Sequence, residues 1–600
     1  MKDPSNGEST SSPPHGEQGS KHPSKNLAPS RTENQSPEAK VETPQTHEEP
    51  GAIAGESVEQ VGAIAGDFPV AKSTLREPSS GRSAFLVGAG ILISRIIGLV
   101  RQRVFAHYFG LSDAGDAFNA AFRIPNFLQN VFGEGALSAS FIPVYAKLLS
   151  RGEKEEATRL ANAVLTILVL TSSVIVLLGI LTTPYLIPLI APGFDGEKRE
   201  LTIQLVKIFF PGAGLLVFSA WCLGILNSHR RFFLSYTAPV VWNLAIIASL
   251  VFFGRRLGQF PLAEAVAWGS VIGSALQFFV QLPTVFRLVK GLKPTLQTST
   301  ANVRLVLRNF FPVFFSRSVV QISAFVDAWL ASWLGTGAVA ALAYTQSIYT
   351  LPVSLFGMSV SAAELPTMSS AVGTTEEVAA ILRKRLNDGL QRIAFFIVPS
   401  AIAFLFLGDV IAAVLYQTGE FKHEAAIYLW GILAGSGIGL LAATLGRLYS
   451  STYYALHDTR TPLIYAIVHV VLATGFGYLW SIPLPGLLGI ELKWGVVGLT
   501  ASASLGAWVE FFLLRAKLNR RIGNTGLAAN YLVKLWAAGL VAASIGWALK
   551  WVTAELHPIP VAAIVLGLYG VSYFAITHLL GISESRLVVG RILRLLKLAR

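Results

Sequence analysis

The sequence predicts an all-α polytopic membrane protein with about fourteen transmembrane helices, each near the ~20 apolar residues that a bilayer requires. Of the 600 residues, 52% are hydrophobic and only 14% are charged, and the mean hydropathy is +0.54. Cations also gather in alternate loops between the apolar stretches. This composition excludes an ordinary soluble domain, and the single cysteine, Cys222, excludes an intrachain disulfide framework.

Residues 1–80 form a separate region, in which Ser, Pro, Glu, Gln and Lys predominate. It holds 7 Lys and Arg against 12 Asp and Glu, so it carries −5 and the rest of the chain +18. With so few apolar side chains it is expected to be a disordered tail. Its short repeat, GAIAGE at 51–56 and GAIAGD at 62–67, is interpreted as a duplicated linker. No apolar core precedes residue 84, so no cleavable signal peptide is expected.

The apolar stretches predict the order of the spans. They cover 84–109, 116–146, 160–191, 203–227, 232–254, 262–286, 306–334, 338–371, 389–416, 425–454, 461–481, 494–514, 529–552 and 559–580. If the N-terminus is cytoplasmic, the inner loops hold 19 Lys and Arg and the outer loops 7. This bias predicts a multi-pass protein of the bacterial inner membrane with both termini in the cytoplasm.

Two short matches indicate an internal repeat. Ser94-Arg95 in the first span recurs as Ser316-Arg317 in the seventh, and SASFIP at 138–143 recurs as SAAELP at 361–366. A shift of six spans preserves orientation, so the repeat is parallel and predicts two pseudosymmetric six-helix lobes with a site between them. The predicted regions are an N-lobe at 84–286, a C-lobe at 306–514 and two C-terminal helices at 529–580.

The basic apolar segment 586–600 is expected to lie along the cytoplasmic membrane surface. A solvated terminal helix is the alternative. No Walker A, HExxH, CxxC or GxSxG motif that would indicate an enzyme occurs. We therefore expect a transporter rather than an enzyme, with no cofactor and no metal site. The positive charge is assigned to cytoplasmic loops and not to nucleic-acid binding.

Charged residues inside apolar spans are the candidate site, because a charge at bilayer depth costs at least ~2.5–3.5 kcal/mol and must face a wet cavity or a partner. Arg95, Arg101 and Arg123 lie in the first two spans, and Arg317 lies in the seventh. Guanidinium groups grip phosphates in a bidentate manner, so these four arginines are predicted to bind a diphosphate in the lumen. For Arg103, snorkelling to the lipid headgroups is the alternative.

Three acids are predicted to form ion pairs that change during transport: Asp116, Glu134 and Glu364. The partner of Asp116 is expected to be an arginine of the first span, with a helix-cap role as the alternative. Glu364 and Glu134 are each considered as partners of Arg317. Glu134 has a purely structural alternative, and Arg447 has the alternative of a place near a helix end.

The stretch 94–145, SRIIGLVRQRVFAHYFGLSDAGDAFNAAFRIPNFLQNVFGEGALSASFIPVY, resembles the first two spans of the MurJ/MviN lipid II flippases. GILN at 224–227, LYQTGEF at 415–421 and HDTRTP at 457–462 extend the resemblance over 84–580. It implies a transporter of the multidrug/oligosaccharidyl-lipid/polysaccharide exporter superfamily. The implied substrate is an undecaprenyl-diphosphate-linked glycopeptide, moved to the periplasmic leaflet for peptidoglycan synthesis, with residues 529–580 forming a groove for its lipid tail.

The same resemblance implies substrate or gating roles for Arg95, Arg101, Asp116, Arg123 and Glu134, and it matches Arg447 to a family lysine. At two positions where the family usually has arginine, this chain has Gln129 and Ser347. The alternatives are therefore a diverged paralogue that exports another lipid-linked oligosaccharide, or a non-transporting scaffold that binds cell-wall synthesis proteins through its tail. Membrane lipid is an expected partner in every case.

Overall fold

The computed structural model describes residues 80–293, 295, 300–553 and 555–588, without the side chains of 80–89, 91, 133–135 and 315–324. The predicted disordered tail with its repeat, and most of the basic C-terminal segment, lie outside these residues. The described part is one compact unit within Ser73–Arg600.

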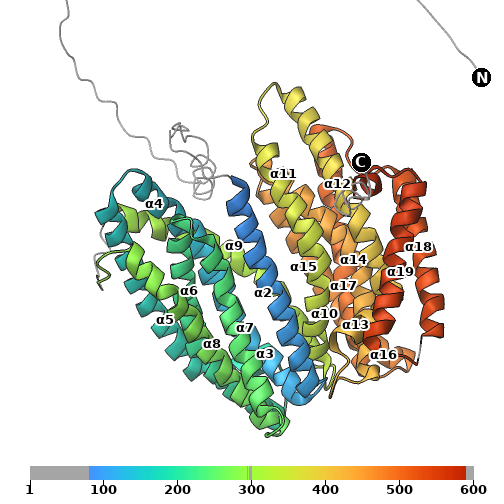
Figure 1. The fold of residues 1–600 in the computed structure, drawn as a ribbon, viewed down its shortest axis with the longest axis horizontal. Helices are drawn as coiled ribbons and strands as arrows, with labels where there is room; N and C mark the ends of the chain where they lie inside the picture. The colour runs from blue at the N-terminus through green and yellow to red at the C-terminus, as the bar shows by residue number, and fades with distance from the viewer. Residues whose placement is uncertain (1–79, 294, 296–299, 554, 589–600) are drawn as a thin grey trace, which may run out of the picture. The chain divides into compact units, whose positions relative to one another are not determined.

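The first half of the described chain is a series of long helices (Figure 1). Its elements are α2 (Ser80–Phe109), α3 (Asp113–Leu128), the π-helix η1 (Gln129–Leu137), α4 (Ser138–Ser150), α5 (Lys154–Ile190), α6 (Gly196–Ser228), α7 (Phe232–Phe253) and α8 (Gln259–Leu288).

The second half repeats this pattern and adds two helices at its end. Its elements are α9 (Ala301–Ser332), α10 (Ala338–Pro352), the π-helix η2 (Val353–Met358), α11 (Ser359–Ser369), α12 (Thr375–Phe406), α13 (Gly408–Tyr416), α14 (His423–Ala455), α15 (Arg460–Ser481), α16 (Pro483–Leu488), the 3₁₀-helix η3 (Leu492–Trp494), α17 (Gly495–Ile522), α18 (Ala529–Val552) and α19 (Pro558–Leu579).

The predicted all-α membrane fold is confirmed, whereas the predicted count of about fourteen spans is not. Eleven helical segments of the described chain are long and apolar enough to cross a bilayer. The long helical runs outside these eleven are α2, α3–α4 and α9. These three runs carry Arg95, Arg101, Arg123 and Arg317, and each of them also contains residues whose side chains are not described.

Both halves contain one helix with a π-helical interruption, in α3–η1–α4 and in α10–η2–α11. Pro125 precedes η1 by four residues, and Pro352 directly precedes η2. Proline removes a backbone N–H donor, which favours a local change of hydrogen-bond register. The interruption in the first half begins at Gln129, because α3 continues to Leu128. The two interruptions support the parallel repeat.

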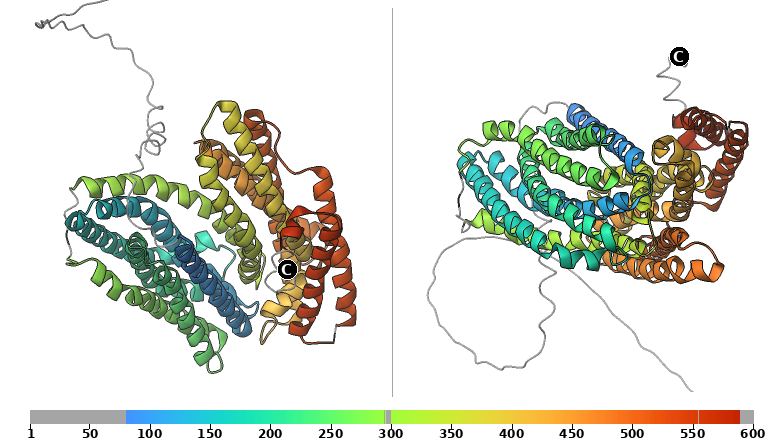
Figure 2. Two further views of the ribbon diagram at one scale, coloured as in Figure 1. Left: turned by 45° about the horizontal axis from the view of Figure 1, so that its top comes forward. Right: turned by 90° about the horizontal axis from the view of Figure 1, so that it is seen from below.

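Helix α9 packs against both halves of the chain. Near its start, Val303 and Val306 are buried in a cluster with residues of the first half, and Phe310 lies 6.0 Å from Phe132 of η1. Near its end, Leu330 is buried in the larger core that includes α10 and α17. This helix therefore connects the two cores, and Figure 2 shows it running beside the first half.

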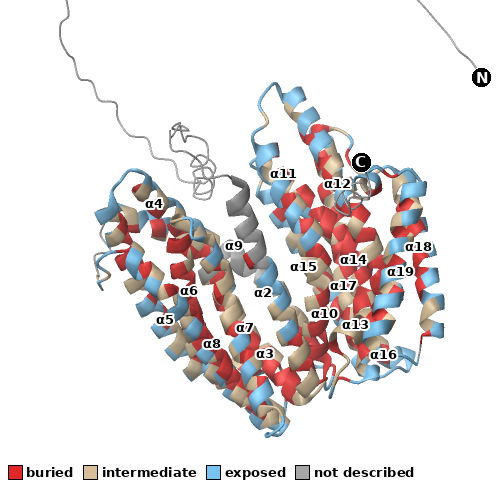
Figure 3. Cartoon of the chain, in the orientation of Figure 1, coloured by how far each residue is buried: buried red, intermediate tan, exposed pale blue. Residues whose placement is uncertain are grey.

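The outward faces of the peripheral helices are apolar and exposed. Leu177 and Leu181 of α5 are examples, and so is Trp551 of α18. Figure 3 shows the exposed colour along α5 and along α18, with buried residues concentrated in central helices such as α14. Exposed apolar surface of this kind is suited to lipid rather than to water.

Candidate functional site

Asp116 joins the two halves of the protein at the end where α2 stops and α3 begins. Its carboxylate is buried and accepts hydrogen bonds from the backbone N–H groups of Gly337 and Ala340, both at 2.7 Å. These groups lie at the start of α10, where a helix has unpaired N–H donors and a partial positive charge. Lys198 of α6 forms an ion pair with the same carboxylate at 2.6 Å. A carboxylate of the first half therefore caps a helix of the second half.

The predicted partner of Asp116 is wrong, because its cation is Lys198 and not an arginine of α2. Lys198 also lies 2.9 Å from Asp113, and the Thr336 hydroxyl donates to Asp113 at 2.9 Å. The cap of its own helix α3 is instead Ser112, which accepts from Gly115. Lys198 lies 82 residues further along the chain, so no local pattern could have indicated this pair.

Arg103 provides a second contact of the same kind. Its guanidinium donates to the carbonyl oxygens of Val414 and, at 2.9 Å, of Leu415 near the end of α13. The last carbonyls of a helix carry partial negative charge, which attracts a cation. The snorkelling alternative for Arg103 is therefore wrong. We call these two sets, Asp116 with the start of α10 and Arg103 with the end of α13, the helix-end contacts.

The backbones of the two halves also approach closely beside the helix-end contacts. Gly110 has φ +52°, and a Cβ there would lie 2.6 Å from the carbonyl oxygen of Glu420. The Tyr344 hydroxyl donates to the Gly110 carbonyl at 3.1 Å, and the Glu420 N–H donates to the His107 carbonyl at 2.9 Å. Only glycine fits this position without strain. The two halves are thus closed against each other at this end.

Arg101 lies on an aromatic surface of the first half. Its guanidinium carbon lies 5.3 Å from the centre of the Phe122 ring and 5.7 Å from that of Trp242. The two rings stack at 5.5 Å, with 6° between their planes. Cation–π contacts leave the edge of a guanidinium available as a hydrogen-bond donor. Arg101 is therefore held in place and can still bind an anion.

Arg123, which is half-buried on α3, lies near enough to a polar group of the second half for their charges to interact. Its charge interacts with that of Asp327 on α9, which in turn interacts with His469 on α15. His469 Nδ1 lies 2.7 Å from Glu510 Oε2 of α17. Asp327 and His469 line a cavity of about 150 Å³. Glu510 lies in the interior of α17.

Glu364 is buried on α11, and its partners are on α12. Glu364 Oε1 lies 3.2 Å from Arg392 Nη1, and its Oε2 lies 4.0 Å from Arg385 Nη1. Arg317, the partner considered for Glu364 from the sequence, has a side chain outside the described residues, and the described partners of Glu364 are both on α12. Sequence analysis did not single out Arg392, which lies 28 residues from Glu364.

Four predicted site residues fall outside these contacts. The side chains of Glu134 and Arg317 lie outside the described residues, and only their helices, η1 and α9, are described. Arg95 of α2 and Arg447 of α14 are exposed. The structure therefore joins Arg123 to the second half by charge, and it leaves Arg95 without a described role.

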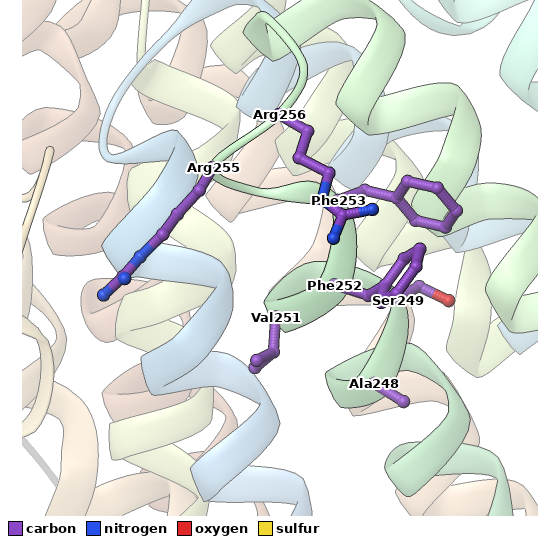
Figure 4. Close-up of a pocket in the computed structure, with 7 residues that line it drawn as sticks. All are labelled: Ala248, Ser249, Val251, Phe252, Phe253, Arg255 and Arg256. Carbon is purple, nitrogen blue, oxygen red and sulfur yellow. The ribbon is translucent and has the colours of Figure 1, made fainter.

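A larger groove lies on the surface of the first half, apart from these residues. It has a volume of about 690 Å³ and is lined by the end of α7 and the turn after it. In Figure 4, Arg255 and Arg256 extend from that turn in different directions, and the Arg256 guanidinium lies 4.4 Å from the centre of the Phe252 ring. None of the predicted site residues lines it. In the described residues, no group of three or more His, Cys, Asp or Glu is placed to hold a metal ion.

Comparison with known proteins gives one consistent family. The family model described as "Lipid II flippase MurJ" matches residues 105–567. A "Lipid II flippase MurJ" of Burkholderia cenocepacia is 30% identical over 515 residues, which are 83% of this chain and 97% of that protein. A "Probable lipid II flippase MurJ" of Aquifex aeolicus is 32% identical over 403 residues, covering 67% of this chain and 77% of that protein.

Solved structures agree with this result. The structure titled "Lipid II flippase MurJ, inward closed conformation" matches with a TM-score of 0.69 and 25% identity, covering 83% of this chain and 98% of that one. An inward-facing multidrug resistance MATE family transporter of the MOP superfamily matches with a TM-score of 0.57 and 17% identity, covering 73% of this chain and 98% of that one. The second likeness concerns the fold alone.

Proposed function

Because the chain belongs to the lipid II flippase MurJ family, we propose that it moves lipid II, an undecaprenyl-diphosphate-linked glycopeptide, between the leaflets of the bacterial inner membrane. The observation that carries the proposal is the pair of arginines in the first half. Arg101 is held by Phe122 and Trp242, and the charge of Arg123 interacts with that of Asp327 of the second half. Two arginines on the adjacent helices α2 and α3 supply positive charge for a diphosphate, and guanidinium groups can bind phosphate in a bidentate manner.

The transport cycle that we propose is alternating access, in which the two lobes rock about the substrate site. The end closed by the helix-end contacts faces the periplasm, and both termini lie in the cytoplasm. The substrate enters from the cytoplasmic side and binds Arg101 and Arg123, with Arg95 and Arg317 as further lumen arginines. Movement to the other side requires Asp116 to leave the N–H groups of α10 and Arg103 to leave the carbonyls of α13.

The acids have two roles in this proposal. Asp116 stabilises the state that is closed to the periplasm, since its buried carboxylate has two backbone N–H donors in addition to Lys198 only while the start of α10 lies against it. Glu134 and Glu364 act as gating acids on the cytoplasmic side, where Glu364 already has Arg392 as a partner. Membrane potential can bias such charge movements by ~2.3 kcal/mol per charge per 100 mV.

Export of another lipid-linked oligosaccharide is the second candidate function. Gln129 and Ser347 favour it, because both stand where the resembling family usually has arginine. A scaffold that recruits cell-wall synthesis proteins is a third candidate, but the ordered placement of Arg101 and the helix-end contacts favours a moving transporter. We expect no catalytic step.

Complementation of a bacterium depleted of its own lipid II flippase tests the proposal. The parent chain should restore growth and cell shape, and Arg101→Ala should fail at equal membrane abundance. Arg256→Ala removes an arginine outside the proposed lumen and serves as the matched control that keeps activity. If the parent inserts at normal levels and still fails, while a lipid-linked oligosaccharide other than lipid II is transported in liposomes, the second candidate replaces the first.

A further inference from the structure

A cluster of two arginines and a buried glutamate lies in the second half, away from Arg101 and Arg123. Arg385 and Arg392 lie seven residues apart on α12, which brings both side chains to one side of the helix. Their exposed fractions are 47% and 56%, whereas that of Glu364 between them is 7%. Charged side chains within membrane-spanning segments are costly in free energy and therefore rare. This cluster on α11 and α12 therefore requires an explanation.

Glu364 holds the arginines but leaves most of their donors unused. Arg392 makes one hydrogen bond to Glu364, at 3.2 Å. Arg385 stands 4.0 Å from the other carboxylate oxygen, which is too far for a hydrogen bond. Each guanidinium has five N–H donors. Asp388 lies between the two arginines on the helix but is not within ion-pair distance of either one in the described structure.

Packing allows this arrangement through Gly389, one turn after Arg385. A Cβ at this position would lie 2.7 Å from Leu448 of α14, so the absence of a side chain lets α12 approach its neighbours. The close approach brings α11, with Glu364, against the arginines of α12. The glutamate therefore acts as a positioning residue that fixes one guanidinium and attracts the other.

Helix α12 stands between α11 and the two C-terminal helices. On one side, Glu364 of α11 contacts Arg392. On the other side, Tyr531 of α18 donates to the carbonyl of Gln391, and Tyr573 of α19 donates to that of Phe395. Arg392 therefore lies one residue from Gln391, whose backbone contacts α18, and Arg385 lies about two turns from it.

We propose that Arg385 and Arg392, positioned by Glu364, form a second anion site that takes the diphosphate of a lipid-linked substrate before it reaches the lumen. The inference rests on the proposed function, because a substrate of this chemistry must approach from the cytoplasmic leaflet. It also accounts for Gln129 and Ser347: two cations on α12 offset the two arginines that are missing from the usual lumen positions.

Binding of farnesyl diphosphate to the full chain in lipid nanodiscs tests the proposal, with inorganic diphosphate and farnesol as separate arms. We expect the Arg385→Gln/Arg392→Gln double variant to bind farnesyl diphosphate about tenfold more weakly, because two charge-assisted contacts are lost. Lys384→Gln, which removes a neighbouring exposed cation from the same helix, should bind as the parent does. Asp388→Asn should bind more tightly.

Comparison of the three compounds shows which part of the ligand the site recognises. Binding of farnesyl diphosphate that depends on both arginines, with weaker binding of inorganic diphosphate, supports a site for a lipid-linked diphosphate. Equal binding of inorganic diphosphate overturns the lipid-linked assignment. If farnesol binds as well as the diphosphate, the site recognises only the tail and the proposal is wrong.

The result for the double variant and the result for the parent separate the second anion site from the proposed lipid II transport on which it rests. If the parent binds and the double variant binds equally well, the second site is excluded while lipid II transport by Arg101 and Arg123 stands. If the parent binds neither diphosphate, both this site and the diphosphate role of the lumen arginines are contradicted. Should the double variant unfold at a lower temperature, Arg385→Gln alone decides the question, since its guanidinium makes no hydrogen bond to Glu364. An unchanged affinity in that variant also overturns the proposal.

Discussion

The two interrupted helical runs, α3–η1–α4 and α10–η2–α11, share a backbone and differ in charge. Thirteen residues before its π-helix, the first run has Asp116 and the second has Ala340, and these two positions contact each other through the Ala340 N–H. In a parallel repeat, the two copies of one position lie beside each other only close to the pseudo-symmetry axis that relates the copies. The first run supplies the carboxylate and the second supplies the end of a helix. The two runs therefore have the same backbone arrangement, whereas the contact between their equivalent positions is asymmetric, with a carboxylate on one side and a backbone N–H on the other.

The two interrupted runs also differ in charge nearer to their π-helices. Six residues before each π-helix, the first run has Arg123 and the second has Ser347. The charge of Arg123 interacts with that of Asp327 on α9, whereas the Ser347 hydroxyl donates to the carbonyl of Ala343 in its own helix. At this pair of equivalent positions the first run has a cation and the second has a neutral hydroxyl. The two positions show that a substrate site can be asymmetric within a symmetric fold.

The largest effect is expected from making the two runs alike at this position. Arg123→Ser should lower lipid II flipping in proteoliposomes by about 100-fold, because a bidentate guanidinium–phosphate contact of ~3 kcal/mol is lost. Arg256→Ser is the matched control and should keep the parent rate. Asp327→Asn in the Arg123→Ser background should recover stability but not transport. A rate within twofold of the parent would show that Arg123 does not bind substrate.

A smaller effect is expected from neutralising the asymmetric contact. Asp116→Asn should open the periplasmic end, because Lys198 loses the buried partner of its charge, and breaking such a pair costs about 3–5 kcal/mol. Distances between spin labels at Leu257→Cys and Leu487→Cys should lengthen, and transport should fall about tenfold.

Asp113→Asn is the control for this measurement, since Asp113 is 42% exposed while Asp116 is fully buried. It should change the label distance much less. An Asp116→Asn protein with the distance distribution of the parent would mean that the α10 cap does not hold the two halves together.

Arg103→Gln should have a more modest effect on the same distances. Glutamine keeps a donor amide but loses the charge that faces the carbonyls of Val414 and Leu415. Cations at helix ends contribute 0.3–1 kcal/mol, and about 2 kcal/mol where they are partly buried. We expect a threefold to tenfold smaller closed population in the same spin-label measurement, with Arg103→Lys intermediate. An effect larger than that of Asp116→Asn would reverse the order of the two contacts.

The smallest effect is expected at Asp458, which lies in the turn between α14 and α15 and joins elements of the second half only. Burial raises the pKa of this carboxyl, but hydrogen bonds from Thr461 and the charge of Arg521 outweigh burial, so its pKa is lowered overall. The lowered pKa adds stability above the unfolded value near pH 4, and this stability is lost as the pH falls through the folded value.

Thermal unfolding checks this prediction. Asp458→Asn should lower the midpoint by a few degrees at pH 7, corresponding to about 1–2 kcal/mol, and the difference from the parent should shrink below about pH 4. The label distances at the periplasmic end should not change. A pH-independent difference would mean that the carboxylate charge does not contribute.

Sequence analysis found the helical membrane class, the family resemblance and the repeat, and it placed Asp116 and Glu364 among the ion-paired acids. It was wrong about the partner of Asp116, and it did not indicate the partner that the structure gives Glu364. Asp116 pairs with Lys198 of α6 and with backbone of α10, and Glu364 pairs with Arg392 of α12. His469 and Glu510 form a pair that the sequence did not indicate, since each is a single polar residue in an apolar helix.

The sequence by itself determined which segments are apolar helices and which charges lie within them, because hydropathy and charge cost are local properties of the chain. Only the tertiary structure decided which charges meet. An ion pair requires two groups within 4 Å, and the pairs that join the two halves here connect residues more than 200 positions apart. Those distances depend on how helices pack, and no local pattern encodes them.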